Sequence, residues 1–90
     1  MLNFEWDPEK ARANEQSHGV TFFEASEVFD DDHSSSVRDP DHSLDEDRYL
    51  IFGMSKGGRY LVVSYTEHND RVRLISARQM TPRERRAYEQ

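Results

Sequence analysis

A histidine, several carboxylates and an arginine lie close together near the middle of the chain, in the seven residues from His42 to Arg48. An imidazole can take or give a proton near neutral pH, a carboxylate can orient it or act as a base, and a guanidinium can neutralise an oxyanion. The spacing alone is not specific, because many acidic loops contain a histidine. The stretch is therefore either an acid–base site or an ordinary solvated loop.

Arginines dominate the second half of the chain. Residues 1–47 carry 14 acidic and 3 basic side chains, whereas residues 48–90 carry 4 acidic and 9 basic ones, within a net charge of −6. Strand alternation places Arg71 and Arg73 on one face, with Val72 and Leu74 on the other. One guanidinium group can donate hydrogen bonds to two oxygens of the same phosphate. This face is therefore either a phosphate-binding platform or a solvated surface with cross-strand ion pairs.

Other reactive motifs are not found in the sequence. The run from Asp30 to His33 can attract a divalent cation, but it lacks the glycine and final glutamate of a calcium loop. The sequence holds no phosphate-binding loop, zinc ligand set or nucleophile elbow, and no cysteine. We therefore expect no metal and no cofactor. With no apolar run of membrane length and no signal-peptide pattern, we expect a cytoplasmic protein without a membrane partner.

Two helices are expected in the N-terminal half of what we take as one domain, residues 1–90. Asp7 is a preferred N-cap, Pro8 suits the first helical position, and Gly19 is placed to end the helix in a left-handed turn. Thr21 to Glu24 is a capping box that predicts a second helix reaching Val28 or Phe29. The carboxylates of 30–32 oppose the helix dipole and should end it.

Strands dominate the second half. The patterns at 49–52, 59–66 and 71–78, separated by turns at 55–58 and 67–70, predict an antiparallel meander. Residues 33–47 are expected to be a loop with a possible short strand at Ser35–Arg38, and Thr81-Pro82 should start a basic C-terminal helix. The fold class is α+β, with two N-terminal helices, an antiparallel sheet of three to four strands and a C-terminal helix.

Several segments, in order over residues 4–88, resemble the BrnT family of bacterial toxins. They are Phe4-Glu5-Trp6-Asp7-Pro8-x-Lys10-Ala11-x-x-Asn14, His18-Gly19-Val20-x-Phe22-x-Glu24-Ala25, Asp39-Pro40-Asp41-His42-Ser43-x-x-Glu46-x-Arg48, Gly53-x-Ser55-x-x-Gly58-Arg59, Arg71-x-Arg73-x-Ile75-Ser76-Ala77-Arg78 and Glu84-Arg85-x-x-Tyr88. The resemblance implies a RelE-like ribonuclease toxin of a type II toxin–antitoxin module. It also implies a BrnA-like antitoxin that neutralises the toxin and supplies the binding to operator DNA.

If the chain is such a ribonuclease, no metal is needed, because RNA carries its own 2′-hydroxyl nucleophile. We then expect His42 or Glu46 to transfer protons, and Arg48, Arg73 and Arg78 to hold phosphate and transition-state charge. Lys56, Arg59 and Arg71 would position the RNA backbone. Arg83, Arg85 and Arg86 on the last helix would contact the antitoxin. The alternative is a non-catalytic binding module that docks an acidic antitoxin or nucleic acid through the basic sheet and this helix.

Overall fold

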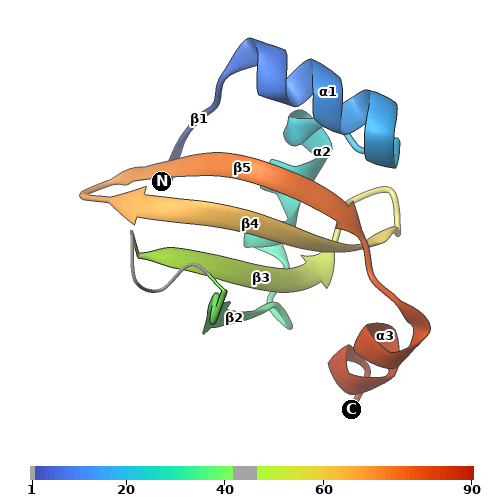
Figure 1. Cartoon of the computed structure of the whole chain (residues 1–90). Helices are drawn as coiled ribbons and strands as arrows, with labels where there is room; N and C mark the ends of the chain where they lie inside the picture. The colour runs from blue at the N-terminus through green and yellow to red at the C-terminus, as the bar shows by residue number, and fades with distance from the viewer. Residues whose placement is uncertain (1, 42–46) are drawn as a thin grey trace.

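Five strands form one sheet in the order β1-β5-β4-β3-β2. In the computed structural model, which describes residues 2–41 and 47–90, three helices and a 3₁₀ turn accompany the sheet (Figure 1). The elements are β1 (Asn3–Glu5), α1 (Pro8–His18), α2 (Phe22–Glu27), η1 (Val28–Asp30), β2 (Ser35–Arg38), β3 (Arg48–Met54), β4 (Tyr60–His68), β5 (Arg71–Gln79) and α3 (Pro82–Tyr88). Within these residues no helix has the length and apolar character needed to cross a membrane.

The two N-terminal helices begin where their capping residues predict. The Asp7 carboxylate accepts from the Glu9 amide at 2.9 Å, Pro8 opens α1, and Gly19 closes it with φ 67°. Thr21 accepts from the Glu24 amide and starts α2. The expected extension of this α-helix to Val28 or Phe29 is wrong in one respect: the α-helix ends at Glu27 and continues as the 3₁₀ turn η1.

The meander β3-β4-β5 is antiparallel as predicted, and the possible strand at Ser35–Arg38 is present as β2. The expectation of a wholly antiparallel sheet of three to four strands is wrong, because β1 adds a fifth strand that runs parallel to β5. Three residues are too few to show a period of two in the sequence. The strand is held instead by pairing with β5 and by Phe4, whose ring packs against Phe29.

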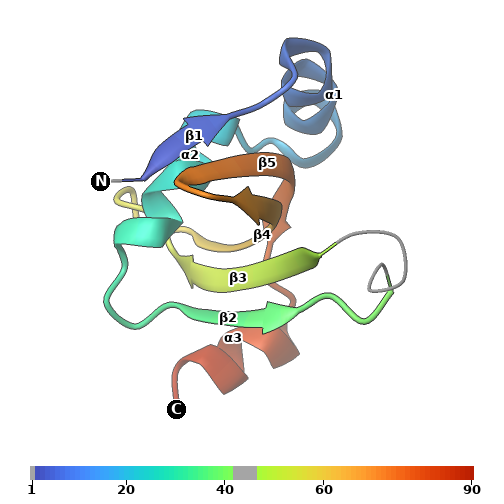
Figure 2. The same cartoon turned by 90° about the vertical axis from the view of Figure 1, so that its left-hand side faces the viewer.

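The core lies between the sheet and the helices α1 and α2. Its buried side chains are Val20, Phe22, Ala25 and Val28 from the helical side and Ile51, Leu61, Val63, Tyr65, Val72, Leu74 and Ala77 from the sheet. The C-terminal helix α3 lies apart from α1 and α2, beyond β3 and β2 (Figure 2). It has no buried residue. One face of the sheet is therefore covered by helices, and the other, which we call the open face, meets α3 at one end and no other helix of the described residues.

A β-bulge interrupts the pairing of β4 with β5. Ser64 pairs with Ser76 and the next residue, Tyr65, pairs with Leu74, so Ile75 is left without a partner in the register. An extra residue of this kind shifts the alternation of the strand that contains it. As a result Leu74 and Ala77, which are three residues apart, both face the core.

Asn14 of α1 ties this shifted part of β5 to the helical layer. Its side chain is buried, its amide nitrogen donates to Ala77 O at 2.9 Å and to Val20 O at 3.0 Å, and its oxygen accepts from Ala77 N at 3.0 Å. Strand β1 pairs with β5 only at residues 71–73. Asn14 thus satisfies backbone groups that a longer neighbouring strand would otherwise pair.

Gly53 allows β3 to approach the turn η1 closely. A Cβ atom at this position would lie 2.6 Å from Val28 Cγ1 and 3.2 Å from Asp31 Oδ2. The missing side chain leaves room for the Asp31 carboxylate, which accepts from the Met54 amide at 2.8 Å and from the Tyr88 hydroxyl. Asp31 therefore connects the end of β3 to α3.

We expect Asn14→Ala to lower the free energy of unfolding by about 3 kcal/mol, because it leaves three buried backbone groups without their partner. Chemical denaturation followed by circular dichroism measures this loss. The matched control is Gln16→Ala, which removes an exposed amide from the same helix and should change stability by less than about 0.5 kcal/mol. Equal effects of the two substitutions would show that the Asn14 contacts do not stabilise the fold.

Candidate nucleic-acid interface

A row of polar and basic residues crosses the open face at one end of the sheet. Arg48 on β3 pairs in register with Thr66 on β4, and Thr66 pairs with Arg73 on β5. Residues opposite each other in a sheet project to the same face, so Thr66 lies between two arginines. Two strand spacings separate these arginines by roughly 10 Å. We call Arg48, Thr66 and Arg73 the arginine row.

Hydroxyl groups occupy the next positions of the same face. Ser64 pairs with Ser76 and with Leu50, one step along from the arginine row. The following step brings Val62 opposite both Phe52 and Arg78. The open face therefore changes from basic through hydroxyl-bearing to mainly apolar along the strands, and Arg78 lies roughly 15 Å from Arg73 along β5.

The bulge determines that Arg73 and Arg78 share a face. These residues are five positions apart, and strict alternation would send them to opposite sides of the sheet. Because Ile75 is skipped in the pairing, both project from the open face. Thr66, Ser64 and Ser76 were not among the residues predicted from the sequence. The alternation of β4 could have indicated the first two, whereas Ser76 requires knowledge of the bulge.

Arg71 and Arg73 are both held by Glu5 of β1. Arg71 Nη1 lies 3.4 Å from Glu5 Oε1, and Arg73 Nη1 lies 3.0 Å from Glu5 Oε2. The two arginine side chains are 72% and 50% exposed. Surface ion pairs of this kind contribute little to stability, so a polyanion can compete for these guanidinium groups.

Arg78 is bound more firmly, by the carboxylate of Glu84 on α3. Its two terminal nitrogens donate to the two carboxylate oxygens at 2.8 and 2.9 Å. The hydrogen bonds from Arg78 outweigh the effect of burial and lower the pKa of Glu84 from 4.5 to about 2, and the same pair raises the pKa of Arg78. Glu84 also accepts from the Thr81 amide and completes the capping box of α3. One carboxylate thus caps the helix and orients Arg78.

The described ends of the segment between β2 and β3, which are residues 39–41 and Asp47, lie next to Arg48 of the arginine row. Asp39 is buried, donates its amide to Arg48 O at 2.8 Å and accepts from the Asp41 amide at 3.0 Å. On the returning side Asp47 pairs with Arg38 at 2.5 Å. His42 and Glu46 lie outside the described residues, so their predicted roles in proton transfer stay predictions.

Arg59 and Lys56 lie on the helical side of the molecule, away from the arginine row. Arg59 donates to both oxygens of Glu24 and, at 2.8 Å, to the carbonyl of Gly19. The hydrogen bonds from Arg59 lower the pKa of Glu24 despite its burial. Glu24 was predicted to complete a capping box, but its carboxylate binds Arg59 and Ser55. These contacts give Arg59 a structural role, and its RNA contact stays a prediction.

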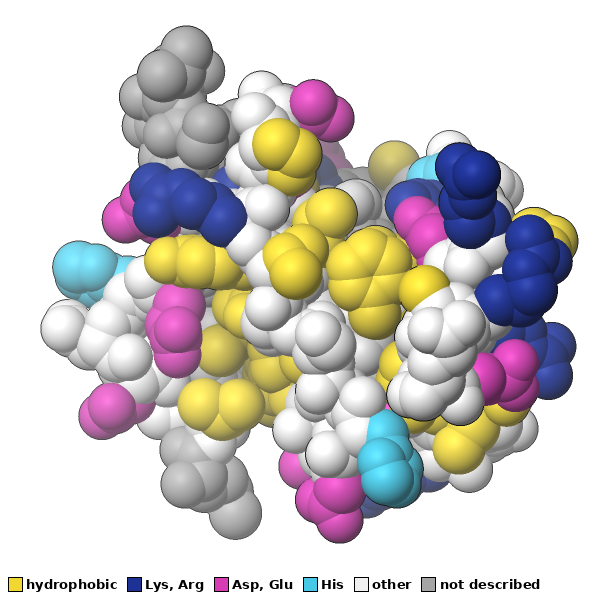
Figure 3. Space-filling view, turned by 90° about the horizontal axis from the view of Figure 1, so that it is seen from below, with side chains coloured by type: hydrophobic (Ala, Val, Ile, Leu, Met, Phe, Trp, Pro, Cys, Tyr) yellow, Lys and Arg dark blue, Asp and Glu magenta, His cyan; other side chains and the backbone are white. Residues whose placement is uncertain are grey.

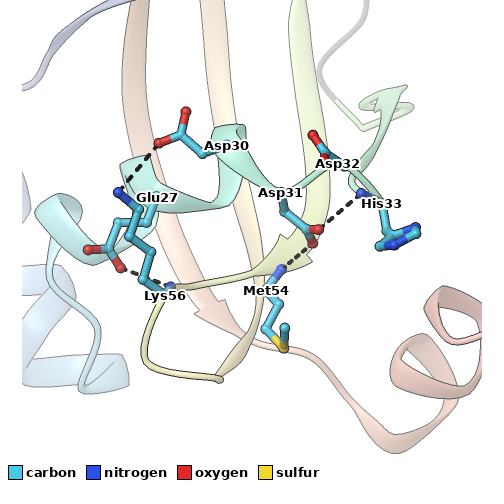
Figure 4. Close-up of a pocket in the computed structure, with 7 residues that line it drawn as sticks. All are labelled: Glu27, Asp30, Asp31, Asp32, His33, Met54 and Lys56. Atoms are coloured by element: carbon cyan, nitrogen blue, oxygen red, sulfur yellow. Dashed lines mark hydrogen bonds and ion pairs between the residues drawn. The ribbon is translucent and has the colours of Figure 1, made fainter.

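Lys56 closes one side of an acidic pocket of about 250 Å³ around the turn η1 (Figure 4). Its ammonium lies 3.9 Å from Asp30, and its amide donates to Glu27. Asp31 points instead toward the amides of Met54 and His33 (Figure 4). Burial raises the pKa of Asp31, but its hydrogen bonds from Tyr88, His33 and Met54 outweigh this and hold it below its ordinary value. The described residues contain no cluster of potential metal ligands.

The three arginines of α3 occupy two different faces of the helix. Arg85 stacks on the Tyr60 ring at 4.0 Å and lies 3.7 Å from Glu89. Arg83 lines a groove between α3 and β2, and Arg86 follows it on the same side of the helix. The predicted contact of all three with an antitoxin stays a prediction.

Comparison with known proteins identifies relatives of this chain. The sequence model of a family described as "Ribonuclease toxin, BrnT, of type II toxin-antitoxin system" matches residues 6–84. The crystal structure of the Brucella abortus ribonuclease toxin BrnT superimposes with a TM-score of 0.65 at 20% sequence identity, covering 90% of this chain and 99% of that one. No curated protein matches.

We expect acid to release α3 from the sheet. Because the pKa of Glu84 is lowered in the folded protein, its contribution to stability is complete above pH 4.5 and is lost as the pH falls toward about 2. Asp31, which accepts from Tyr88 on the same helix, is shifted in the same direction. Nuclear magnetic resonance signals of Ala87 and Tyr88 should therefore change over this range.

Glu84→Gln retains an acceptor for the cap but removes the charge that pairs with Arg78. This variant should lose the part of the pH dependence that belongs to Glu84. The matched control is Glu89→Gln, also on the C-terminal segment, where the ion pair with Arg85 is longer and more exposed. If the α3 signals of Glu84→Gln change with pH as they do in the wild-type protein, the Glu84 carboxylate does not hold the helix.

Proposed function

Because the chain belongs to the BrnT family of ribonuclease toxins of type II toxin–antitoxin systems, we propose that it is an endoribonuclease that binds RNA on its open face. The observation that carries this proposal is the arginine row, with Arg48 and Arg73 on either side of Thr66. The exposed hydroxyl of Ser76 follows directly on the same face, next to Ser64, whose side chain is buried. Guanidinium and hydroxyl groups are common donors to phosphate oxygens.

The proposed chemistry uses the 2′-hydroxyl of the RNA as nucleophile and does not require a metal. His42 or Glu46 removes its proton or protonates the departing 5′ oxygen, and arginines stabilise the charge on the phosphorane oxygens. Both candidate proton-transfer residues belong to the loop whose ends lie beside Arg48. Since Arg73 and Arg78 lie far apart along β5, we assign them to different phosphates. Arg48 and Arg73 serve the scissile phosphate, and Arg78 a neighbouring one.

The biological role that we propose follows from the family. The chain is a RelE-like toxin that acts in the cytoplasm, cleaves RNA and thereby inhibits translation. A BrnA-like antitoxin neutralises it and supplies the operator-DNA binding of the toxin–antitoxin complex. The acidic N-terminal half and basic C-terminal half of the sequence are consistent with a protein that binds polyanions only locally.

The second candidate function is a binding module without catalysis. The observation in its favour is that Arg71, Arg73 and Arg78 all have carboxylate partners on this chain. Such arginines can form a docking surface, where the carboxylates of an acidic partner replace the carboxylates of this chain as their ion-pair partners. The two candidates differ in whether RNA is cut.

Incubation of the free protein with RNA in the presence of EDTA tests the catalytic proposal. We expect cleavage, with products that end in a 2′,3′-cyclic or 3′ phosphate, because attack by the 2′-hydroxyl leaves the phosphate on the 3′ side. Analysis of the RNA ends measures this. Products with a 5′ phosphate, or cleavage only with added divalent metal, would refute the proposed route. Intact RNA together with measurable RNA binding would favour the binding module.

Arg73→Ala should lower the cleavage rate at saturating RNA by about 10² to 10³, which corresponds to roughly 3 to 4 kcal/mol of lost charge stabilisation. Arg73→Lys should restore little, because an ammonium cannot bind two phosphate oxygens in the manner of a guanidinium. Arg73 is a better position for this test than Arg78, because replacing Arg78 also removes the partner of Glu84 and so weakens the attachment of α3. Single-turnover kinetics measure the rate.

The control for electrostatic steering is Lys56→Ala, which removes a 71% exposed cation far from the arginine row. We expect only weaker binding, with the logarithmic salt dependence flatter by about one charge. If Arg73→Ala behaves in the same way, and added salt reproduces its effect, Arg73 is a docking residue and not a catalytic one.

A further inference from the structure

We infer that the groove between α3 and the β2 edge of the open face is the docking site for an acidic, amphipathic segment of the antitoxin. This inference takes the existence of an antitoxin from the proposed function, and adds where and by what chemistry it binds. The groove has a volume of about 340 Å³. Ser35, Val37 and Phe52 form its floor, and Arg83, Ala87 and Tyr88 form its wall.

The floor of the groove is an apolar surface that the fold leaves uncovered. Strand β2 lies at the edge of the sheet, and all four of its residues are exposed. Val37 in this floor is 47% exposed, and Phe52 beside it is half-buried. Seen from this side, hydrophobic side chains occupy the middle of the surface, and Lys and Arg side chains lie along its right-hand margin and at its upper left (Figure 3). Contiguous exposed apolar surface on a small protein indicates a binding site.

The wall of the groove supplies positive charge that is not neutralised by the residues the structure describes. The face of α3 that meets the sheet carries Glu84, Arg85 and Tyr88, which bind Arg78, Tyr60 and Asp31. Arg83 and Ala87 line the groove next to Glu84 and Tyr88, and helical spacing places Arg86 beside Arg83 at the margin of the groove. Within residues 2–41 and 47–90, neither Arg83 nor Arg86 has an ion-pair partner, whereas Arg85 pairs with Glu89. The docking segment therefore needs carboxylates opposite Arg83 and Arg86.

This combination fits a protein segment better than RNA. Aliphatic or aromatic side chains can dehydrate Val37, Phe52 and Ala87 at little cost, whereas a sugar–phosphate backbone remains hydrated. The arginine row lies roughly 13 Å along the strands from Phe52, so the two surfaces are separate. A segment in the groove also lies against Glu84 and Tyr88, the residues that hold α3 beside Arg78. Occupation of the groove thus restricts the approach of RNA to Arg78.

The test uses as probe the purified antitoxin that the proposed function requires, titrated into the toxin by calorimetry. Val37→Glu places a carboxylate in the apolar floor and should weaken binding about 100-fold. The matched control is Phe23→Glu on α2, which changes an even more exposed apolar residue, 70% exposed, on the opposite side of the molecule. This control should leave the affinity unchanged.

The charge requirement is tested by reversing Arg83 and Arg86 together to Glu. We expect a loss of affinity and a flatter dependence of the affinity on salt, because both cations face the acidic partner. Arg12→Glu on α1 serves as control and should alter neither. Unchanged binding by Val37→Glu, or equal losses for Val37→Glu and Phe23→Glu, would overturn the docking site.

Cleavage of RNA by each free variant separates this inference from the proposed function. Val37→Glu should cut RNA at the wild-type rate and bind the antitoxin more weakly than the wild-type protein does. If Val37→Glu loses RNA cleavage but binds the antitoxin normally, the groove belongs to RNA and the inference fails while the ribonuclease proposal stands. If the wild-type protein binds the antitoxin in this groove but never cuts RNA, the docking site stands and the ribonuclease proposal fails.

Discussion

The side chain of Asn14 acts as a short substitute for a missing strand, and the arrangement of the sheet depends on it. Strand β1 leaves β5 after Glu5, so the outer edge of β5 at Ala77 has no backbone neighbour of its own. Asn14 satisfies both the amide and the carbonyl of Ala77, and with the same nitrogen binds Val20 O. A single buried amide therefore joins α1, the start of α2 and the part of β5 that follows the bulge. No apolar residue of similar size could make these contacts.

The bulge that precedes Ala77 determines which side chains the open face presents. Leu74 and Ala77 both face the core, and Arg73 and Arg78 both project from the open face, although the spacing within each pair is odd and does not fit a period of two. A strand with regular alternation would have to bury one arginine or expose one core residue. The local irregularity of β5 thus allows one strand to serve a complete hydrophobic core on one side and a basic surface on the other.

The parts of this fold that could be predicted are those with local causes. Asp7, Thr21 and Thr81 start helices through contacts within four residues, Gly19 ends one, and alternation locates β3 to β5. The parts that could not be predicted depend on partners distant in sequence. The Glu24 side chain binds Arg59 and Ser55 in preference to its own helix cap, and β1 is defined only by its neighbour. For the site, alternation indicated the shared face of Arg71 and Arg73 but not the position of Arg78.

The helix α3 lies between the groove and Arg78 and contacts both. It contains no buried residue, and polar contacts hold its inner side. Its inner side depends on Glu84 with Arg78, on Tyr88 with Asp31 and on Arg85 with Tyr60. Burial and the hydrogen bond to Asp31 raise the pKa of Tyr88 to about 12, so this contact retains its proton at neutral pH. Arg83 and Ala87 line the groove beside Glu84 and Tyr88, and Arg86 lies next to Arg83 on the helix. A helix held in this way can move without disturbing the core, and any movement displaces Glu84 and so changes the setting of Arg78. For the two proposed sites, this arrangement predicts that binding in the groove and binding of phosphate at Arg78 are coupled through the Glu84 carboxylate, and reciprocity then requires each ligand to alter the affinity of the other.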